Sequence, residues 1–151
     1  MDFEKLKKFL VKAKRNTYAT DGEDNEETLL DGTKELEFKE GDFLYRDRYF
    51  GSNPFIGEEV VFYNGKVIWG MNYCGGVISD VSSEEIYVFL KKALRQVDKI
   101  IPFRGPKHFE DGKLKYINTV NGDIKKFDGI EEIFLNEKGI YKLIYHGGIV
   151  N

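Results

Sequence analysis

The sequence predicts an α+β fold. We expect an internally duplicated unit, one helix followed by antiparallel strands, assembled into a curved antiparallel sheet with the two helices packed on one face. Two observations predict it: segments of the chain recur at fixed spacings, and each copy runs from an amphipathic helical segment into strand segments joined by short turns. The βαβ alternation with glycine-rich phosphate turns that is typical of α/β proteins does not occur in the pattern.

The strongest repeat joins residues 55–78 to residues 127–150. These segments align without a gap at a spacing of 72 residues, and ten of 24 positions are identical. Random pairing would give roughly one or two identities, so the match indicates duplication. A second match, between residues 9–15 and 89–95, has a spacing of 80 residues, which places about eight extra residues between helix and strands in the first copy.

The first copy begins with a helix. Asp2 can cap a helix that runs to about Arg15, because apolar residues recur on one stripe of this segment. The acidic residues 20–28 are expected to form a solvated loop. Residues 36–39 and 42–50 alternate as strands do, which puts Phe43, Tyr45, Asp47 and Tyr49 on one face.

The second copy also begins with a helix. Ser82 and Glu85 form a capping box before apolar residues of helical period, which predicts a helix to about Val97. Four strands are expected to follow, near residues 113–120, 123–127, 131–136 and 140–146.

Three short turns are predicted. Asn64-Gly65 has the composition of a two-residue hairpin turn. Asn121-Gly122 is expected to join the first two strands of the second copy. Residues 136–139 suit a type I turn followed by a glycine bulge.

Composition narrows the functional classes. The chain has 151 residues, 26 acidic and 23 basic residues, and a formal net charge of −3, which disfavours direct nucleic-acid binding. The single Cys74 excludes an internal disulfide and a multi-cysteine zinc site, and fits a reducing compartment. We find no metal-ligand spacing, no cofactor motif, no signal peptide and no long apolar run. The sequence therefore predicts one cytoplasmic domain over residues 1–151, without membrane contact, whose internal repeats cover approximately residues 2–78 and 82–150.

Acidic residues inside apolar strands are the main functional signal. A carboxylate that faces a core costs several kcal/mol unless it is paired, so it indicates a partner or a functional role. Asp47 is one such residue, and Glu58 or Glu59 is the other. A two-residue turn at Asn64-Gly65 puts Glu58 on the face of Trp69, whereas the repeat puts Glu59 there, and a slip of one residue exchanges the two faces.

The leading functional hypothesis is a small-molecule (effector) binding domain with an aromatic-lined, acidic pocket. The alternative for the acids is structural, as partners of tyrosine hydroxyls, Arg104 or the backbone. The expected pocket walls are Tyr45, Tyr49, Trp69, Met71 and Tyr73, and the expected orienting groups are Asp47, Glu58 or Glu59, and Arg104.

Two other classes remain open. A small hydrolase or isomerase would use His146 with a carboxylate, and Glu132 is the candidate if the two share a strand face. No nucleophile turn accompanies them, so the sequence favours binding over catalysis. A dimerisation or protein-interaction module is the third class, with the aromatic face as the interface and a homodimer as the expected assembly.

The chain also resembles a family known as domain of unknown function 5680. The resemblance lies in FLVKAKRNTYA (residues 9–19), EGDFLYRDRYFG (40–51), FIGEEVVF (55–62), WGMNYCG (69–75), RGP (104–106), the VNGD and FDGIEEI segments, and HGGIV (146–150). Members of this uncharacterised bacterial family are often fused C-terminal to helix-turn-helix regulators of the XRE type. The resemblance implies a module that senses an effector or contacts a protein, and it implies no catalytic residue.

Overall fold

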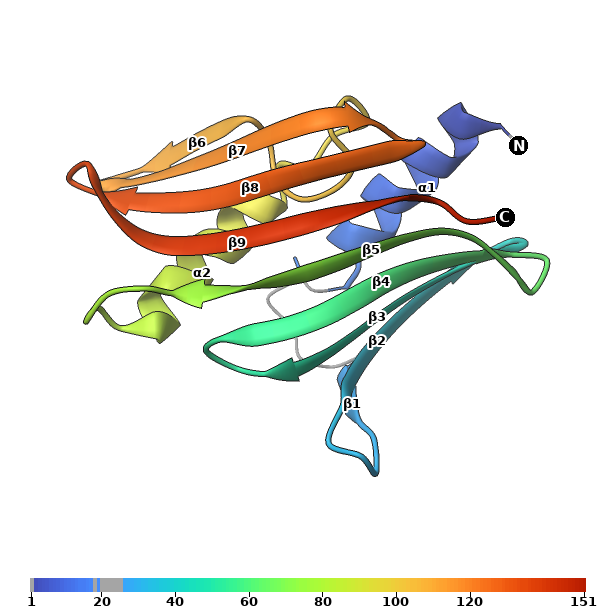
Figure 1. Cartoon of the computed structure of the whole chain (residues 1–151), viewed down its shortest axis with the longest axis horizontal. Coiled ribbons are helices and arrows are strands. Elements are labelled where there is room, and N and C mark those ends of the chain that lie inside the picture. Colours follow the sequence, from blue (N-terminus) through green and yellow to red (C-terminus); the bar gives the residue numbers. More distant parts are fainter. Residues whose placement is uncertain (1, 18, 20–25) are drawn as a thin grey trace.

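A computed structural model describes residues 2–17, 19 and 26–151. Its main element is an open antiparallel sheet of nine strands in the order β1-β2-β3-β4-β5-β9-β8-β7-β6 (Figure 1). The strands are β1 (Glu26–Thr28), β2 (Lys34–Glu40), β3 (Phe43–Gly51), β4 (Phe55–Tyr63), β5 (Lys66–Val77), β6 (His108–Asp111), β7 (Leu114–Asp123), β8 (Lys126–Leu135) and β9 (Lys138–Ile149).

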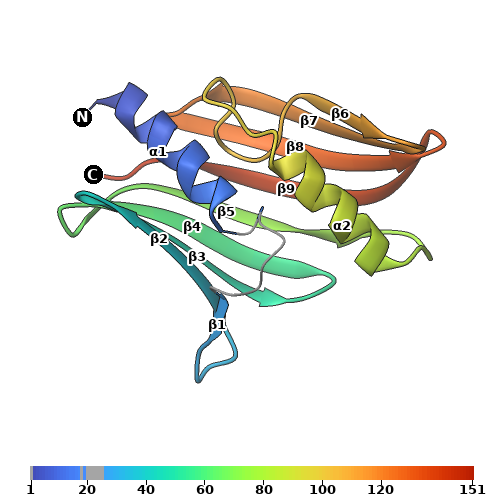
Figure 2. The ribbon, with the colours of Figure 1, turned by 180° about the vertical axis from the view of Figure 1, so that it is seen from behind.

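Two helices cover one face of this curved sheet (Figure 2). Helix α1 spans Phe3–Arg15 and packs against β2 and β3, and helix α2 spans Ser83–Leu94 and packs against β6 and β7. Each helix begins as predicted, because Asp2 accepts from the backbone N–H groups of Glu4 and Lys5, and Ser82 accepts from that of Glu85. Helix α2 ends three residues before the predicted Val97. No helix in the described part of the chain is long and apolar enough to cross a membrane.

The hydrophobic core lies between the helices and the covered face of the sheet, here called the inner face. The apolar stripes of both helices, which the periodicity predicted, point into it, and Phe9, Leu10, Phe89 and Leu90 on these stripes are all buried. Alternate strand residues complete the core, because successive side chains of a strand point to opposite faces. The opposite, outer face carries neither of the two helices in the described part of the chain (Figure 1).

Strands β5 and β9 pair at the centre of the sheet. Tyr73 lies directly opposite Tyr145, and from this pair each half of the sheet runs outward through a hairpin with a bulge. The extra residue of the first bulge is Ile68 of β5, opposite the step from Val61 to Phe62, and that of the second is Ile140 of β9, opposite the step from Ile133 to Phe134. These bulges are 72 residues apart along the chain, which is the spacing of the sequence repeat.

One predicted turn was in the wrong place, and another has a different type. Asn121-Gly122 lies inside β7, and the chain turns after Asp123, which pairs with Lys126. Gly122 is required there by close approach instead, since a Cβ would lie 2.1 Å from the Lys126 carbonyl oxygen.

The turn after β8 also differs from the prediction. Asn136 and Glu137 both have positive φ and Leu135 pairs with Lys138, so the connection is a two-residue turn of the primed kind. Of the predicted acidic loop, residues 20–25 lie outside the described residues, and Glu26–Thr28 forms β1.

Candidate functional site

The strand register identifies which glutamate faces the core. The β4–β5 hairpin does turn at Asn64-Gly65, but the bulge at Ile68 of β5 shifts the ladder by one residue. Glu59 therefore lies opposite Met71 on the inner face, as the repeat predicted. Glu58 projects from the exposed outer face, so it is not a pocket residue on the side of Trp69.

Glu59 forms a fully buried ion pair with Lys14 from helix α1. The Lys14 ammonium also lies over the rings of Tyr45 and Trp69, at 5.6 and 5.9 Å from their centroids. Burial lowers the pKa of Lys14, against the opposing attraction of Glu59. We did not predict this lysine, although it follows Leu10 by four residues and therefore shares the buried stripe of the helix.

Asp47 is the second buried acid of this half. It lies directly opposite Glu59 in the β3–β4 ladder, and its side chain accepts a hydrogen bond of 2.5 Å from the Tyr73 hydroxyl. Burial, and after it the negative charge of Glu59, raises the pKa of the Asp47 carboxyl to about 7. The pKa of Tyr73 is also raised by burial and then by Asp47, so the hydroxyl keeps its proton and remains the donor.

A glycine allows Tyr73 to reach Asp47. Gly57 lies between them in the sheet, and a Cβ there would come within 2.5 Å of the Tyr73 hydroxyl. The ring therefore lies flat across the backbone of β4. A side chain at position 57 would occupy the space that the tyrosine needs.

The second half of the sheet contains a corresponding arrangement in which the acceptor is an amide. Tyr145 lies across Gly129 and donates to the Asn118 side chain at 2.8 Å. Asn118 in turn donates to the Gly105 carbonyl at 3.0 Å. Asn118 lies opposite Glu131 as Asp47 lies opposite Glu59, so an amide in one half corresponds to a carboxyl in the other.

Glu131 is bound by three donors. Arg104 donates to both of its oxygens, at 3.1 and 2.9 Å, and Tyr116 and Tyr141 donate at 2.6 and 2.9 Å. Burial, followed by the charge of Glu131, raises the pKa of Tyr116 and of Tyr141. Every Glu131 oxygen is thus satisfied, which is the pattern of a structural network. The sequence analysis named tyrosine hydroxyls and Arg104 as structural partners for Asp47 and Glu58 or Glu59, whereas here Arg104, Tyr116 and Tyr141 bind Glu131.

A cavity of about 560 Å³ opens beside Asp47, between helix α2 and strands β2 to β5. Asp47, Tyr73 and Arg104 line its polar end, and Arg104 lies over the Tyr73 ring at 5.6 Å. The apolar wall consists of Leu36, Phe55, Tyr87, Val88, Leu90 and Leu94. The remaining charged side chains of the lining are Glu26, Lys34, Glu84 and Lys91.

Four of the predicted pocket residues line this cavity: Asp47, Tyr49, Tyr73 and Arg104. Another four, Tyr45, Glu59, Trp69 and Met71, are buried beside it on the inner face without lining it. In this buried group, the indole N–H of Trp69 and one Glu59 oxygen have no hydrogen-bond partner within the described residues.

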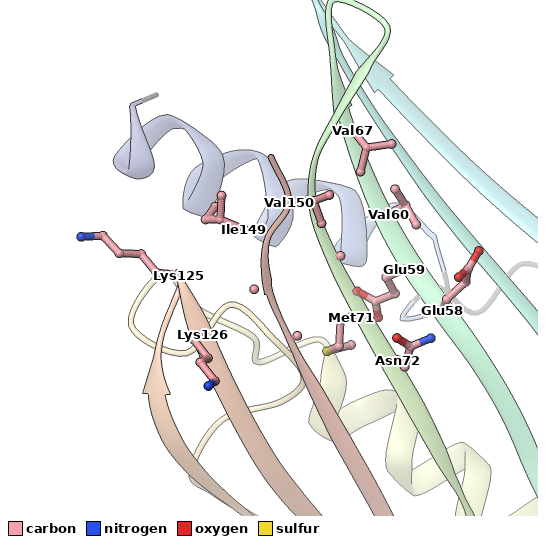
Figure 3. A pocket seen from close by; sticks show the side chains of 13 residues that line it. Glu58, Glu59, Val60, Val67, Met71, Asn72, Lys125, Lys126, Ile149 and Val150 are labelled. Carbon is pink, nitrogen blue, oxygen red and sulfur yellow. The ribbon is translucent and has the colours of Figure 1, made fainter.

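A second hollow, of about 450 Å³, lies over the central strands near the C-terminus (Figure 3). Gly70, Gly147 and Gly148 help to form it, because glycine has no side chain to fill the space. The predicted residues Glu59 and Met71 also belong to its lining and are buried, whereas its other polar side chains, Glu58, Asn72, Lys125 and Lys126, are exposed. Exposed polar groups of this kind remain hydrated, so the hollow is the weaker candidate for a site.

The structure does not bring His146 and Glu132 together. Both belong to the outer face, but Glu132 lies opposite Lys142, whereas His146 is exposed and lies opposite Asp128 and Asn72. His146 is four residues from Lys142 along strand β9, which corresponds to about 13 Å. The expected His–Glu pair is therefore not formed. No group of three or more potential metal ligands occurs in the part of the chain that the structure describes.

Fold and site together define an α+β domain with one helix-covered antiparallel sheet and a buried carboxyl at the end of a cavity. The chain belongs to the family described as Domain of unknown function (DUF5680), whose match covers residues 47–150. This match includes Asp47, Glu59, Tyr73 and Arg104, and begins after Lys14. Neither the curated proteins nor the solved structures contained a match.

Proposed function

We propose that this protein is a small-molecule binding domain whose ligand occupies the cavity between helix α2 and strands β2 to β5. One observation carries the proposal: the buried carboxyl of Asp47 lies at the polar end of a cavity of about 560 Å³ and forms no ion pair with any described residue. Cavities of this size that combine apolar walls with a few converging polar groups are the usual binding sites for small molecules. A buried acid with a perturbed pKa is a further mark of such sites.

The other two functional classes have less support. His146 and Glu132, the candidates for acid–base catalysis, belong to the outer face, on the opposite side of the sheet from Asp47. An aromatic interface would need exposed rings, but Tyr45, Trp69 and Tyr73 are buried beneath the helices. Binding within the cavity therefore accounts for more of the arrangement than catalysis or dimerisation does.

The test is a fragment screen by ligand-observed NMR on the whole chain and on two variants. Asp47→Asn keeps the shape of the side chain and removes its charge, and we expect it to weaken the hits at least tenfold. Glu58→Gln is the matched control, since it removes a carboxylate from the outer face of the neighbouring strand and should leave the hits unchanged. Hits that bind the Asp47→Asn variant as tightly as the unaltered protein would contradict a site at Asp47.

We also infer that the domain arose by duplication of a helix-plus-strands unit. The repeat spacing of 72 residues, the bulges at corresponding positions and the two Tyr–Gly crossings support this origin. Alignment of further family members tests it, because their halves should match at corresponding positions more often than unrelated strands do. An effector-sensing role in the cytoplasm would fit the fusion to regulators that the family resemblance implies.

A further inference from the structure

We propose that the ligand is an organic cation, an amphipathic amine whose ammonium group binds Asp47 and whose apolar part lies against Phe55, Tyr73 and Tyr87. The inference rests on the proposed function and narrows it to one chemical class. Three features of the cavity carry it: the balance of charge at its polar end, the aromatic wall, and the available volume.

Three of the positively charged side chains at or near the cavity have anionic partners among the described residues, and Lys91 of helix α2 also belongs to the lining. Arg104 is held by both oxygens of Glu131. Lys14, behind the polar end, is paired with Glu59, and at the rim Lys34 lies 3.5 Å from Glu26. Glu59 and Glu131 each have a cationic partner, whereas Asp47 forms no ion pair with a described residue.

Asp47 has only one neutral donor among the described residues, the Tyr73 hydroxyl. The charged and titratable groups around it are Lys14 of helix α1, Glu59 of β4, Tyr73 of β5, and Arg104 from the segment after helix α2. A buried carboxylate in this position lacks a cation in direct contact, which is costly in a low-dielectric environment. A ligand ammonium group would supply that contact as a charge-assisted hydrogen bond.

The wall next to Asp47 is aromatic. Phe55 packs edge-on against Tyr73, with ring centroids 5.9 Å apart, and edge-on against Tyr87 at 6.0 Å. The Tyr87 hydroxyl donates to the Asn53 side chain at 2.7 Å, which fixes that ring. Aromatic faces attract cations and repel anions, so this wall favours a cationic ligand, as the carboxylate of Asp47 does.

The volume limits the size of the ligand. A cavity of about 560 Å³ is within the range that holds one small organic molecule, and its apolar residues Leu36, Leu90 and Leu94 would accommodate a hydrocarbon body. A small inorganic cation would leave this apolar wall without a contact. An amphipathic amine satisfies both ends of the cavity.

Binding of a cation should depend on pH. Burial holds the pKa of Asp47 at about 7, so the empty site is largely protonated below that pH, and the ammonium group must displace the proton. The affinity for a cation should therefore fall by about tenfold for each pH unit below 7 and level off above it. A neutral compound gains at most a stronger hydrogen bond when Asp47 ionises, and an anionic compound is repelled.

The experiment uses a fragment library in which each aromatic body occurs in cationic, neutral and anionic form, for example 2-phenylethylamine, 3-phenylpropanamide and 3-phenylpropionate. We expect the cationic members to predominate among the hits at pH 8 and to bind at least tenfold more weakly at pH 6 and to the Asp47→Asn variant. If Asp47→Asn does not fold, Tyr87→Leu serves as the second variant, and it should weaken the cations more than the matched neutral compounds.

The outcomes separate this inference from the proposed function. Hits that are mainly neutral or anionic, or cations that bind equally at both pH values, would overturn the cation assignment while leaving a functional cavity. Absence of hits of any charge would overturn the binding function as well. Cations that lose affinity on Glu58→Gln but keep it on Asp47→Asn would also overturn the assignment, because they would bind on the outer face.

Discussion

Tyr73 and Tyr145 lie opposite each other where the two halves of the sheet meet, and each reaches across a glycine to a different kind of acceptor. Tyr73 donates to the carboxyl of Asp47, and Tyr145 donates to the amide of Asn118. The second half shows that a neutral amide can fill this structural position. The carboxyl of Asp47 is therefore more than the fold requires, which is why our functional proposal centres on it.

The first prediction concerns the pH dependence of stability. The pKa of Asp47 is raised to about 7 in the folded protein from an ordinary value of 3.8, so the folded state binds more protons between these values. The free energy of unfolding should therefore fall as pH rises through this window, by at most about 1.4 kcal/mol per pH unit. Asp47→Asn removes this slope. Urea denaturation from pH 4.5 to 8 should show the variant gaining stability relative to the unaltered protein as pH rises.

The Glu58→Gln variant is the control for this measurement, because it removes an exposed carboxylate one residue from Glu59. A stability difference between Asp47→Asn and the unaltered protein that stays constant from pH 4.5 to 8 would show that Asp47 does not titrate in this window.

The second prediction concerns the buried pair of Lys14 and Glu59. Replacing one partner leaves the other buried without its opposite charge, so Lys14→Met and Glu59→Leu should each lower the free energy of unfolding by about 3–5 kcal/mol. The double variant should recover much of this loss, since both charges are gone. A double-mutant cycle by urea denaturation measures the coupling, and a value below about 0.5 kcal/mol would contradict the pairing.

The third prediction concerns Arg104. Arg104→Met leaves Glu131 in the core with only tyrosine donors and should cost about 3–5 kcal/mol. The control is the exposed pair of Lys92 and Asp111, at 2.7 Å, where Lys92→Met should cost less than about 1 kcal/mol. Equal losses in thermal denaturation of the two variants would show that burial does not strengthen the Arg104 pair.

The fourth prediction concerns Gly57. An alanine methyl group there would come within 2.5 Å of both the Arg48 carbonyl oxygen and the Tyr73 hydroxyl, so the ring must leave Asp47. We expect Gly57→Ala to cost about 1–3 kcal/mol. Gly139→Ala is the matched control, because its methyl group would meet Phe134 at an ordinary 3.7 Å. If the two variants melt at the same temperature, the crossing of Tyr73 over Gly57 is not needed.

The fifth prediction concerns the face of helix α2. Phe89 is buried, and truncation to alanine should cost about 3–5 kcal/mol. The adjacent Val88 is 56% exposed, and Val88→Ala should change stability by no more than about 0.5 kcal/mol. Chemical denaturation of both variants checks the difference, and a loss below about 1 kcal/mol for Phe89→Ala would show that the inward face is wrongly assigned.

Several structural features could be predicted because they depend on local pattern. Apolar periodicity identified the inward faces of both helices, and strand alternation put Asp47 among buried aromatic residues. The repeat selected Glu59 over Glu58 correctly, although the hairpin turn alone selected the wrong residue. The bulge at Ile68 of β5 explains this difference, because one extra residue between the turn and Trp69 exchanges the β4 side chains that share a face with Trp69.

The partners of the acids could not be predicted in the same way. Lys14 and Glu59 are 45 residues apart in the chain, and Arg104 and Glu131 are 27 apart, so their contacts depend on how the helices and the segment after α2 lie over the sheet. The tyrosines that bind Glu131 were equally hidden, since a tyrosine in a strand is common whether or not its hydroxyl has an acidic partner.

The sequence by itself determined the α+β class, the starts of both helices, the β4–β5 hairpin turn at Asn64-Gly65 and the presence of acids that face a core. These properties follow from periodicity and from the conformational needs of single residues, which act over a few positions. Only the tertiary structure decided which acid is satisfied and which faces a cavity. That distinction depends on desolvation and on charges brought together from distant segments: burial, and after it the charge of Glu59, raises the pKa of Asp47 to about 7 in the folded protein.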